Sequence, residues 1–150
     1  MFILFRKIIF ILICNIAFAN YNENCAMMIN EPNDPEEFSV VLGKKIYFCC
    51  GSCVKAFEKQ TAYYIKALPV IAEMFNGEEL KKLGVDKVKL LSQRFCPVYP
   101  KRVVNPSSNS IEYKGQKVYF WSFGALKRWN RQPDKYFKEA MNRGHLPQYN

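Results

Sequence analysis

Histidine and the common catalytic motifs are scarce in this sequence. His145 is the only histidine, and we expect its imidazole to be solvated in a loose C-terminal tail. The sequence has no Ser/His/Asp arrangement, no phosphate-binding glycine loop and no pair of carboxylates placed for acid–base chemistry. The adjacent acids at 36–37 and 78–79 are expected to be exposed charges. The sequence therefore predicts a protein that is not an enzyme.

The apolar stretch near the N-terminus is too short to span a membrane. It follows two basic residues, falls below the roughly 20 apolar residues of a bilayer-spanning helix, and ends with small residues at Ala17 and Ala19. This arrangement is typical of a secretory signal peptide. We therefore expect a cleavable signal peptide at 1–19 and a periplasmic or secreted protein, with an uncleaved membrane anchor as the alternative. Cys14 lies in this segment and is left out of the site.

Acidic residues are few in the last third of the chain. The whole sequence carries 22 Lys and Arg against 13 Asp and Glu, a net charge of +9, which falls to +7 without the signal peptide. Residues 20–94 contain ten of each sign, whereas residues 95–150 contain ten basic and three acidic residues. A basic surface of this kind attracts an acidic protein or an anionic membrane surface, although a solvated face is the simpler interpretation. Because the protein is predicted to be exported, nucleic acid is not an expected partner.

Two segments of the sequence repeat each other, one beginning at Cys25 and the other at Cys96. The aligned pairs are Gly43 and Gly115, Tyr47 and Tyr119, Phe48 and Phe120, Phe57 and Trp129, Gln60 and Gln132, and Tyr64 and Tyr136. In each copy a glycine separates two short stretches, the second of them β-branched and aromatic, which is typical of a β-hairpin. The apolar spacing that follows is typical of a helix. The sequence therefore predicts an α+β fold of two small modules, each a β-hairpin followed by an α-helix.

The segment between the repeats is predicted to be helical. Pro69 stands near one helix start, Asn76 and Gly77 interrupt the pattern, and a second short helix should end at Gly84. In the first repeat, Ser52 is the predicted N-cap of the helix. The predicted organisation is a first module at 20–66, a helical connector at 67–94, a second module at 95–144 and a tail at 145–150.

Five cysteines remain once the signal peptide is set aside, and four of them fall in the first repeat. Cys49 ends a predicted strand, and Cys53 lies in the first turn of the following helix, where the helix dipole favours a thiolate. Cys25 comes from a distant turn, as a closing ligand should. Three thiolates suit Cu(I) in a trigonal site or form part of a Zn(II) site, and Cys50 would complete a tetrahedral zinc set. Cys50 is the weakest member, because two adjacent cysteines seldom bind one ion comfortably.

Other roles for these sulfur atoms stay open. Export favours disulfides, and four cysteines allow three pairings. The thioether of Met28 would shift the preference towards copper if it were a ligand, whereas core packing is the commoner role of a methionine. Cys96 is expected to be a buried free thiol, with a disulfide to Cys50 as the alternative.

The first repeat resembles a known family. The residues that carry the resemblance are Cys25, Met28, the run Gly43-Lys-Lys-Ile-Tyr-Phe-Cys-Cys-Gly-Ser-Cys53, and Phe57. They are similar to TRASH and YHS domains, which are small treble-clef-like modules associated with the trafficking, resistance and sensing of heavy metals, copper above all. The resemblance implies that Cys25, Cys49 and Cys53 are metal ligands and that Cys50 is a common companion.

The second repeat keeps the frame of such a module and loses its ligands. Trp121, Ser122 and Ala125 stand where the cysteines would be, so we expect a degenerate module without metal. Small modules rarely fold on few apolar contacts once a structural ion is lost. Aromatic packing by Trp121, Phe123 and Trp129 is therefore expected to replace the metal cross-link.

These features together predict an exported heavy-metal-binding protein, which binds Cu(I) or Zn(II) through cysteine thiolates for metal buffering, trafficking or resistance. One alternative is a structural zinc module whose basic second copy, residues 95–150, binds a protein partner or a membrane surface. Another alternative is a thiol–disulfide redox protein that acts through Cys49, Cys50 and Cys53. Redox enzymes, however, usually carry C-x-x-C on a thioredoxin-like frame, and the sequence shows no such frame.

Overall fold

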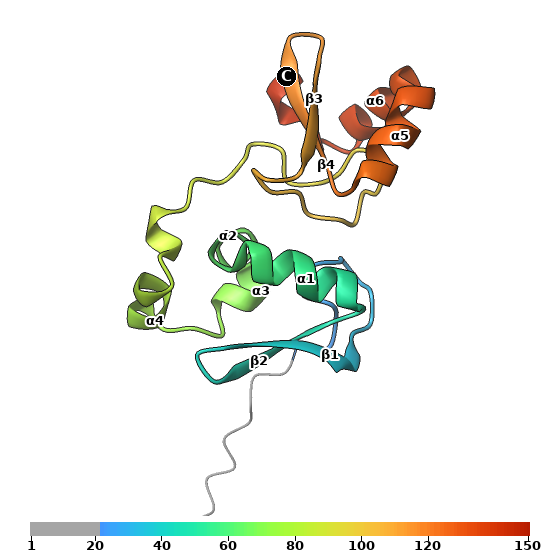
Figure 1. Cartoon of the computed structure of the whole chain (residues 1–150). Coiled ribbons are helices and arrows are strands. Elements are labelled where there is room, and N and C mark those ends of the chain that lie inside the picture. The colour runs from blue at the N-terminus through green and yellow to red at the C-terminus, as the bar shows by residue number, and fades with distance from the viewer. Residues whose placement is uncertain (1–21) are drawn as a thin grey trace, which may run out of the picture.

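A computed structural model of the chain describes residues 22–150, so the predicted signal peptide and Cys14 lie outside the described residues. The described part has an α+β fold with two antiparallel hairpins, each of which is followed by helices (Figure 1). The predicted α+β class is therefore confirmed. Within residues 22–150, no helix is long and apolar enough to cross a membrane.

Each hairpin closes on a two-residue turn that the sequence favours. The pairs are β1 (Asp34–Val41) with β2 (Lys44–Phe48), and β3 (Asn109–Tyr113) with β4 (Gln116–Phe120). The φ angles of the two turn residues are positive, at 49° and 78° for Leu42 and Gly43 and at 46° and 76° for Lys114 and Gly115. This geometry is a type I′ turn, whose twist matches that of the paired strands, and glycine adopts it without steric cost. The predicted tight turns at Gly43 and Gly115 are confirmed.

Two helices follow each hairpin. They are α1 (Gly51–Lys59) and α2 (Thr61–Ala67) in the first half, and α5 (Phe123–Arg131) and α6 (Pro133–Asn142) in the second. Ser122 is the N-cap of α5, and its Oγ accepts a hydrogen bond from the Ala125 N–H at 3.2 Å. Its counterpart Cys50 is the N-cap of α1. The prediction of Ser52 as the N-cap is therefore wrong, because the extended backbone at Cys50 already turns into helix at Gly51.

The first part of the connector between the hairpin units is made of short helices, as expected, whereas residues 88–94 contain no helix. These short helices are α3 (Pro69–Ala72), α4 (Gly77–Lys82) and the 3-10 turn η1 (Val85–Lys87). Asn76 and Glu79 form a capping box at the start of α4, in which each side chain accepts a hydrogen bond from the other residue's N–H. Gly84 follows α4 with a φ of 70°, the left-handed conformation that commonly ends a helix.

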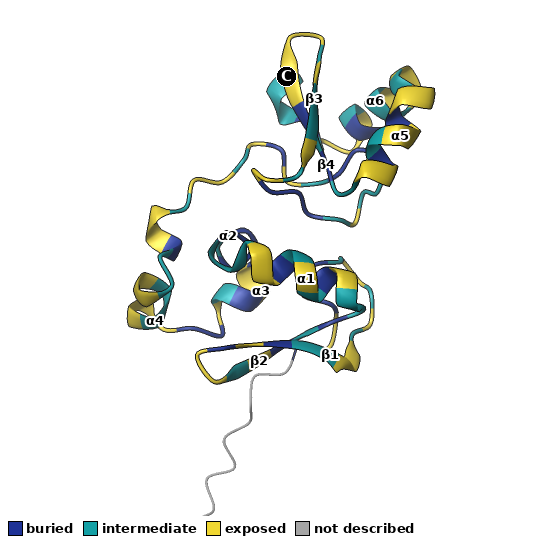
Figure 2. Cartoon of the chain, viewed as in Figure 1, coloured by how far each residue is buried: buried dark blue, intermediate teal, exposed yellow. Residues whose placement is uncertain are grey.

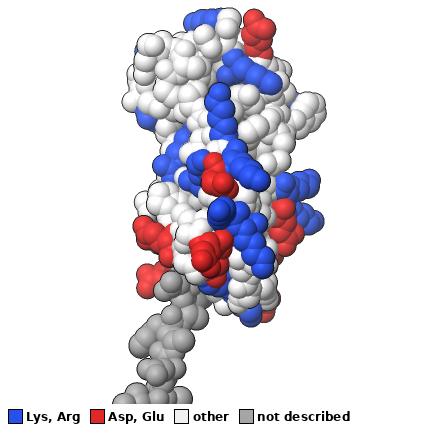
Figure 3. All heavy atoms as spheres, turned by 90° about the vertical axis from the view of Figure 1, so that its left-hand side faces the viewer, with Lys and Arg blue, Asp and Glu red and all other residues white. Residues whose placement is uncertain are grey.

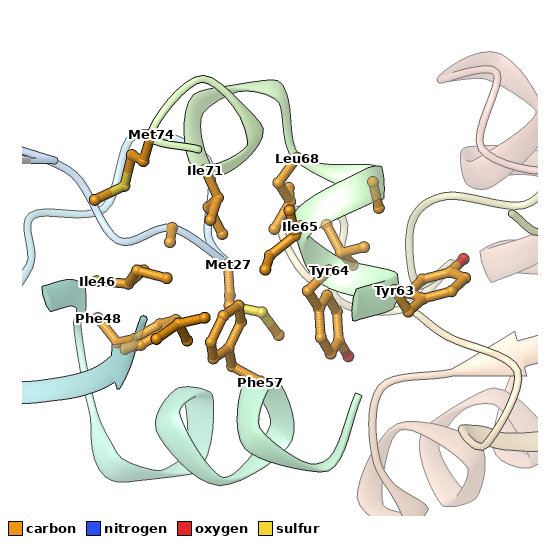
Figure 4. Packing of buried hydrophobic residues seen from close by; sticks show 14 of the residues in the cluster. Met27, Ile46, Phe48, Phe57, Tyr63, Tyr64, Ile65, Leu68, Ile71 and Met74 are labelled. Carbon is orange, nitrogen blue, oxygen red and sulfur yellow. The ribbon is translucent and has the colours of Figure 1, made fainter. Parts of the chain in front are cut away.

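A first hydrophobic core lies between β2 and helices α1 to α3. Phe48, Phe57 and Tyr64 are fully buried, and neighbouring ring centroids in this series lie 5.1 Å and 6.4 Å apart. Figure 4 shows the Met27 side chain at the centre of this cluster, between Phe57 and the helix that carries Tyr64 and Ile65. Met27 is therefore core packing, the common role of a methionine.

A second core fills the other half of the molecule, and buried segments run through both halves in Figure 2. Trp129 is buried, and its ring meets those of Phe120 and Tyr113 at centroid distances of 5.3 Å and 5.2 Å. Trp121 is half-buried and packs against both cores. The expectation that Phe123 fills the core is wrong, since its side chain is 58% exposed. It stands two residues before the buried Ala125, which places it on the opposite face of α5.

The C-terminal segment is packed and not a loose tail. Leu146 is fully buried, and residues Pro147–Tyr149 form the 3-10 turn η2. The Tyr149 hydroxyl donates to the Tyr113 carbonyl in the second hairpin. The ring of His145 lies 4.9 Å from that of Phe95. The difference from the expected solvated tail arises because Leu146 completes the second core.

The turn that opens each half carries Cys25 in the first half and Cys96 in the second. In each half a side-chain amide just before this leading turn makes a pair of hydrogen bonds to the backbone of the second strand, which we call a clamp. The Asn22 amide donates to the Tyr47 carbonyl at 2.7 Å and accepts from the Tyr47 N–H at 2.9 Å. Gln93 makes the same two bonds to Tyr119, at 2.7 Å and 2.9 Å. The clamp at Asn22 ties the turn that carries Cys25 to β2. Sequence comparison missed this equivalence because both amides stand before the leading cysteines and differ in type.

Candidate metal centre

Three thiols from separate parts of the first half converge. Cys25 lies in the leading turn, where its N–H donates to the Glu31 carbonyl at 2.7 Å. Cys49 follows the end of β2, and Cys53 lies in the first turn of α1. The three Sγ atoms all lie within 4.8 Å of one another. We call Cys25, Cys49 and Cys53 the cysteine cluster.

The spacing and burial of the cysteine cluster suit a metal ion. The Sγ atoms of Cys49 and Cys53 are 3.7 Å apart, and sulfur atoms that share a tetrahedral ion at about 2.3 Å lie about 3.8 Å apart. Cys25 and Cys53 are buried, whereas Cys49 is half-buried. Solvent therefore reaches the cluster mainly from the side of Cys49. The cluster could hold a metal ion.

Two further sulfur atoms border the cysteine cluster. Cys50 Sγ is 3.8 Å from Cys49 Sγ and 3.6 Å from Cys53 Sγ, but it does not belong to the mutually close group. It lies 3.0 Å from Ser52 Oγ instead, in an exposed contact. Met28 Sδ is 3.4 Å from Cys49 Sγ. Cys50 and Met28 thus stand at the edge of the cluster, and Met28 is the closer of the two to Cys49.

The three thiols of the cysteine cluster have very different pKa values. A hydrogen bond from the Cys53 thiol lowers the pKa of Cys25 to about 5, although burial opposes this. The same hydrogen bond, together with burial, raises the pKa of Cys53 well above its usual range. Burial and the neighbouring Cys25 raise the pKa of Cys49 to about 12. Near neutral pH the cluster therefore carries one thiolate and two protonated thiols.

We expect the metal affinity of the cysteine cluster to rise with pH. Three thiolates are needed to bind the ion, so the two protonated thiols must each release a proton. The apparent association constant should increase by about two log units per pH unit between about pH 6 and pH 8. Competition titrations against a chelator measure this slope, and a Cys50→Ser variant removes the separate titration of Cys50. A slope near zero would contradict joint binding by the three thiols.

Cys50 carries the more accessible acidic thiol. Partial burial opposes its ionisation, but contacts with the Ser52 hydroxyl and with Cys53 lower the pKa of Cys50 to about 7. A half-buried thiol that is partly ionised at neutral pH reacts readily with oxidants and alkylating reagents. Cys50 is therefore the residue through which oxidation would first reach the site.

Cys96 lies apart from the cysteine cluster, in the second core. It is fully buried and carries a free thiol, and its Sγ accepts a hydrogen bond from the Tyr99 N–H at 3.4 Å. Burial raises the pKa of Cys96. The predicted buried thiol is confirmed, and Cys96 acts as a small core residue.

Arg102 reaches the cysteine cluster from the second half, and sequence reasoning missed it. Its Nη1 donates to Cys53 Sγ at 2.8 Å, across 49 positions of the chain. Its backbone accepts a bond from the Cys96 N–H, as Glu31 does from Cys25 in the first repeat. Arg102 is therefore the counterpart of Glu31. The change from an acidic to a basic residue between the repeats is the signal that could have revealed it.

No family model, curated protein or solved structure matches this chain. The resemblance to TRASH and YHS domains stays a prediction that rests on the residues of the first repeat.

Proposed function

We propose that this protein is an exported heavy-metal-binding protein, which holds Cu(I) or Zn(II) through the thiolates of the cysteine cluster. The observation that carries the proposal is the convergence of three Sγ atoms from a turn, a strand end and a helix start. Export rests on the signal peptide predicted at 1–19. The chemistry is reversible coordination, which suits metal buffering, trafficking or resistance.

The proposed architecture is a pair of treble-clef-like modules, of which only the first binds metal. In the first, the ion would cross-link the leading turn to the hairpin end and to the start of α1. In the second, Cys96, Trp121 and Ala125 occupy the three equivalent positions, so only one thiol remains, and an aromatic core supports the unit instead. The matching clamps at Asn22 and Gln93 support this interpretation.

The positions of the sulfur atoms favour Cu(I) as the bound metal. Three thiolates complete a trigonal copper site, and the Met28 thioether at 3.4 Å from Cys49 adds a soft neighbour. Zinc in a structural site takes four ligands, so Cys50 would have to turn away from Ser52 and join the cluster. We therefore place copper first and zinc second.

Metal analysis tests the proposal directly. The mature protein, purified without oxygen and loaded separately with Cu(I) and with Zn(II), should retain about one equivalent of metal per chain. A chelator should remove the ion while circular dichroism shows the fold unchanged, as trafficking requires. Loss of the fold on metal removal would instead indicate a structural zinc module. No bound metal, together with disulfides in a thiol titration, would contradict the proposal and favour a disulfide-linked protein.

A second candidate function uses the basic surface of residues 95–150, which carry ten basic and three acidic residues. On the face shown in Figure 3, side chains of both charges mix in the lower half, whereas most of the charged side chains in the upper half are Lys and Arg. Such a surface would bind an acidic protein or an anionic membrane surface. Binding to vesicles with and without anionic lipid separates this role from metal binding.

A further inference from the structure

The backbone of Arg102 is held in place by contacts with three residues. Its N–H donates to the Tyr99 carbonyl and its carbonyl accepts from the Cys96 N–H, both at 2.9 Å. Its backbone also pairs with Met28 in an isolated antiparallel bridge between the two halves. The guanidinium therefore approaches Cys53 from a fixed backbone and not from a mobile surface loop.

The side chain of Arg102 is supported by the residue that replaced a ligand. Its guanidinium carbon lies 4.8 Å from the centre of the Trp121 ring. Trp121 stands at the position that corresponds to Cys49 in the first repeat. A cation over a tryptophan face is attracted to it and loses freedom of movement. In the second half, a tryptophan therefore stands at a ligand position, and its ring supports the Arg102 guanidinium that reaches the cysteine cluster of the first half.

The net charge of the metal–thiolate complex decides how strongly the Arg102 guanidinium stabilises it. Three thiolates with Cu(I) carry a net charge of −2, whereas three thiolates with Zn(II) carry −1. A buried negative charge is costly unless an opposite charge compensates it. The attraction to one fixed guanidinium is twice as large for the copper complex as for the zinc complex.

We propose that Arg102 is a specificity-determining residue of the cysteine cluster, whose positive charge favours Cu(I) over Zn(II). This inference rests on the proposed metal-binding function. It gives the second half a role in the site although that half has no ligands of its own. It also makes the pair of repeats one functional unit, because the ligands come from one and the compensating charge from the other.

The test compares the two metals in a Cys50→Ser background, where neither can recruit a fourth thiolate from Cys50. Serine is a good N-cap, as Ser122 shows in the second half, so this parent chain should fold. Arg102→Gln should lower the Cu(I) affinity about tenfold more than the Zn(II) affinity, because the two complexes differ by one unit of charge and a half-buried cation contributes about tenfold per unit. Affinities are measured by competition with chelators specific to each ion.

Two further variants separate charge from shape. Arg102→Lys keeps the charge and should retain most of the copper preference. Arg128→Gln removes the same charge from the same half, where Arg128 lies over the Tyr99 ring, and should leave both affinities unchanged. Equal losses for both metals in Arg102→Gln, or no loss, would overturn the inference. A parent chain that binds neither metal would instead contradict the proposed function.

Discussion

Replacing Cys53 with serine will weaken metal binding by about a thousandfold or more, whereas the same replacement at Cys96 will leave it unchanged. Cys53 is the central member of the cysteine cluster, since its Sγ lies 3.7 Å from that of Cys49 and its thiol donates a hydrogen bond to the Cys25 sulfur. Structural zinc sites bind with roughly 10–16 kcal/mol, so one ligand contributes roughly 4 kcal/mol. The hydroxyl of serine does not ionise at neutral pH and cannot replace a thiolate.

Cys96→Ser is a closely matched control for Cys53→Ser. Both cysteines are fully buried and carry free thiols, so each replacement places one hydroxyl in a core and should cost similar stability. Metal content and chelator competition are then compared at a temperature where both variants are folded, as judged by circular dichroism. Equal losses of metal in the two variants would show that the effect comes from reduced stability and not from a lost ligand.

Features that depend on neighbouring residues could be predicted from the sequence. The type I′ turns follow from Gly43 and Gly115, since a residue with positive φ is needed between two paired strands. The capping box at Asn76 and the left-handed Gly84 likewise follow from local residue types. The proximity of Cys49 and Cys53 was also accessible, because only four positions separate them at the junction of β2 and α1, whereas Cys25 reaches them from a distant turn.

Features that depend on orientation or distant contacts could not be predicted in the same way. Phe123 was expected in the core because it is aromatic, but its place relative to Ala125 turns it to solvent. Met27 and Met28 are adjacent and alike, yet one fills the core and the other lies beside Cys49. Arg102 acts through a contact between two turns, 49 positions from Cys53, and its only signal in the sequence is the change from an acidic residue at Glu31 to a basic one.

Replacing Trp129 with alanine will destabilise the second half by about 3–5 kcal/mol, the usual cost of removing a buried aromatic side chain. Trp129 is 1% exposed and joins Phe120 and Tyr113 in one aromatic group. A core of this size supplies only about 3–5 kcal/mol of net stability, so the loss should unfold the half locally. Hydrogen exchange will show this as lost protection of β3 and β4 amides, with or without metal.

Phe57→Ala is the matched variant in the first half, and metal should rescue it. Phe57 is the counterpart of Trp129, is fully buried, and packs against Phe48. Its removal should also cost about 3–5 kcal/mol, but an ion present at a thousand times its Kd restores about 4 kcal/mol. Protection of β1 and β2 amides should therefore fall without metal and return when Cu(I) is added.

The difference between the two variants depends on how the halves are joined. Their cores are distinct clusters, which are joined by Trp121, packed against both, and by polar contacts that include Arg102 to Cys53, Gln60 to Ser107 and Asn105 to Tyr64. Each such hydrogen bond contributes about 1 kcal/mol net, which is too little to carry the stabilisation of a bound ion from one core to the other. Metal should thus protect the first half alone. Equal rescue of Trp129→Ala by Cu(I) would contradict this and show that both halves unfold together.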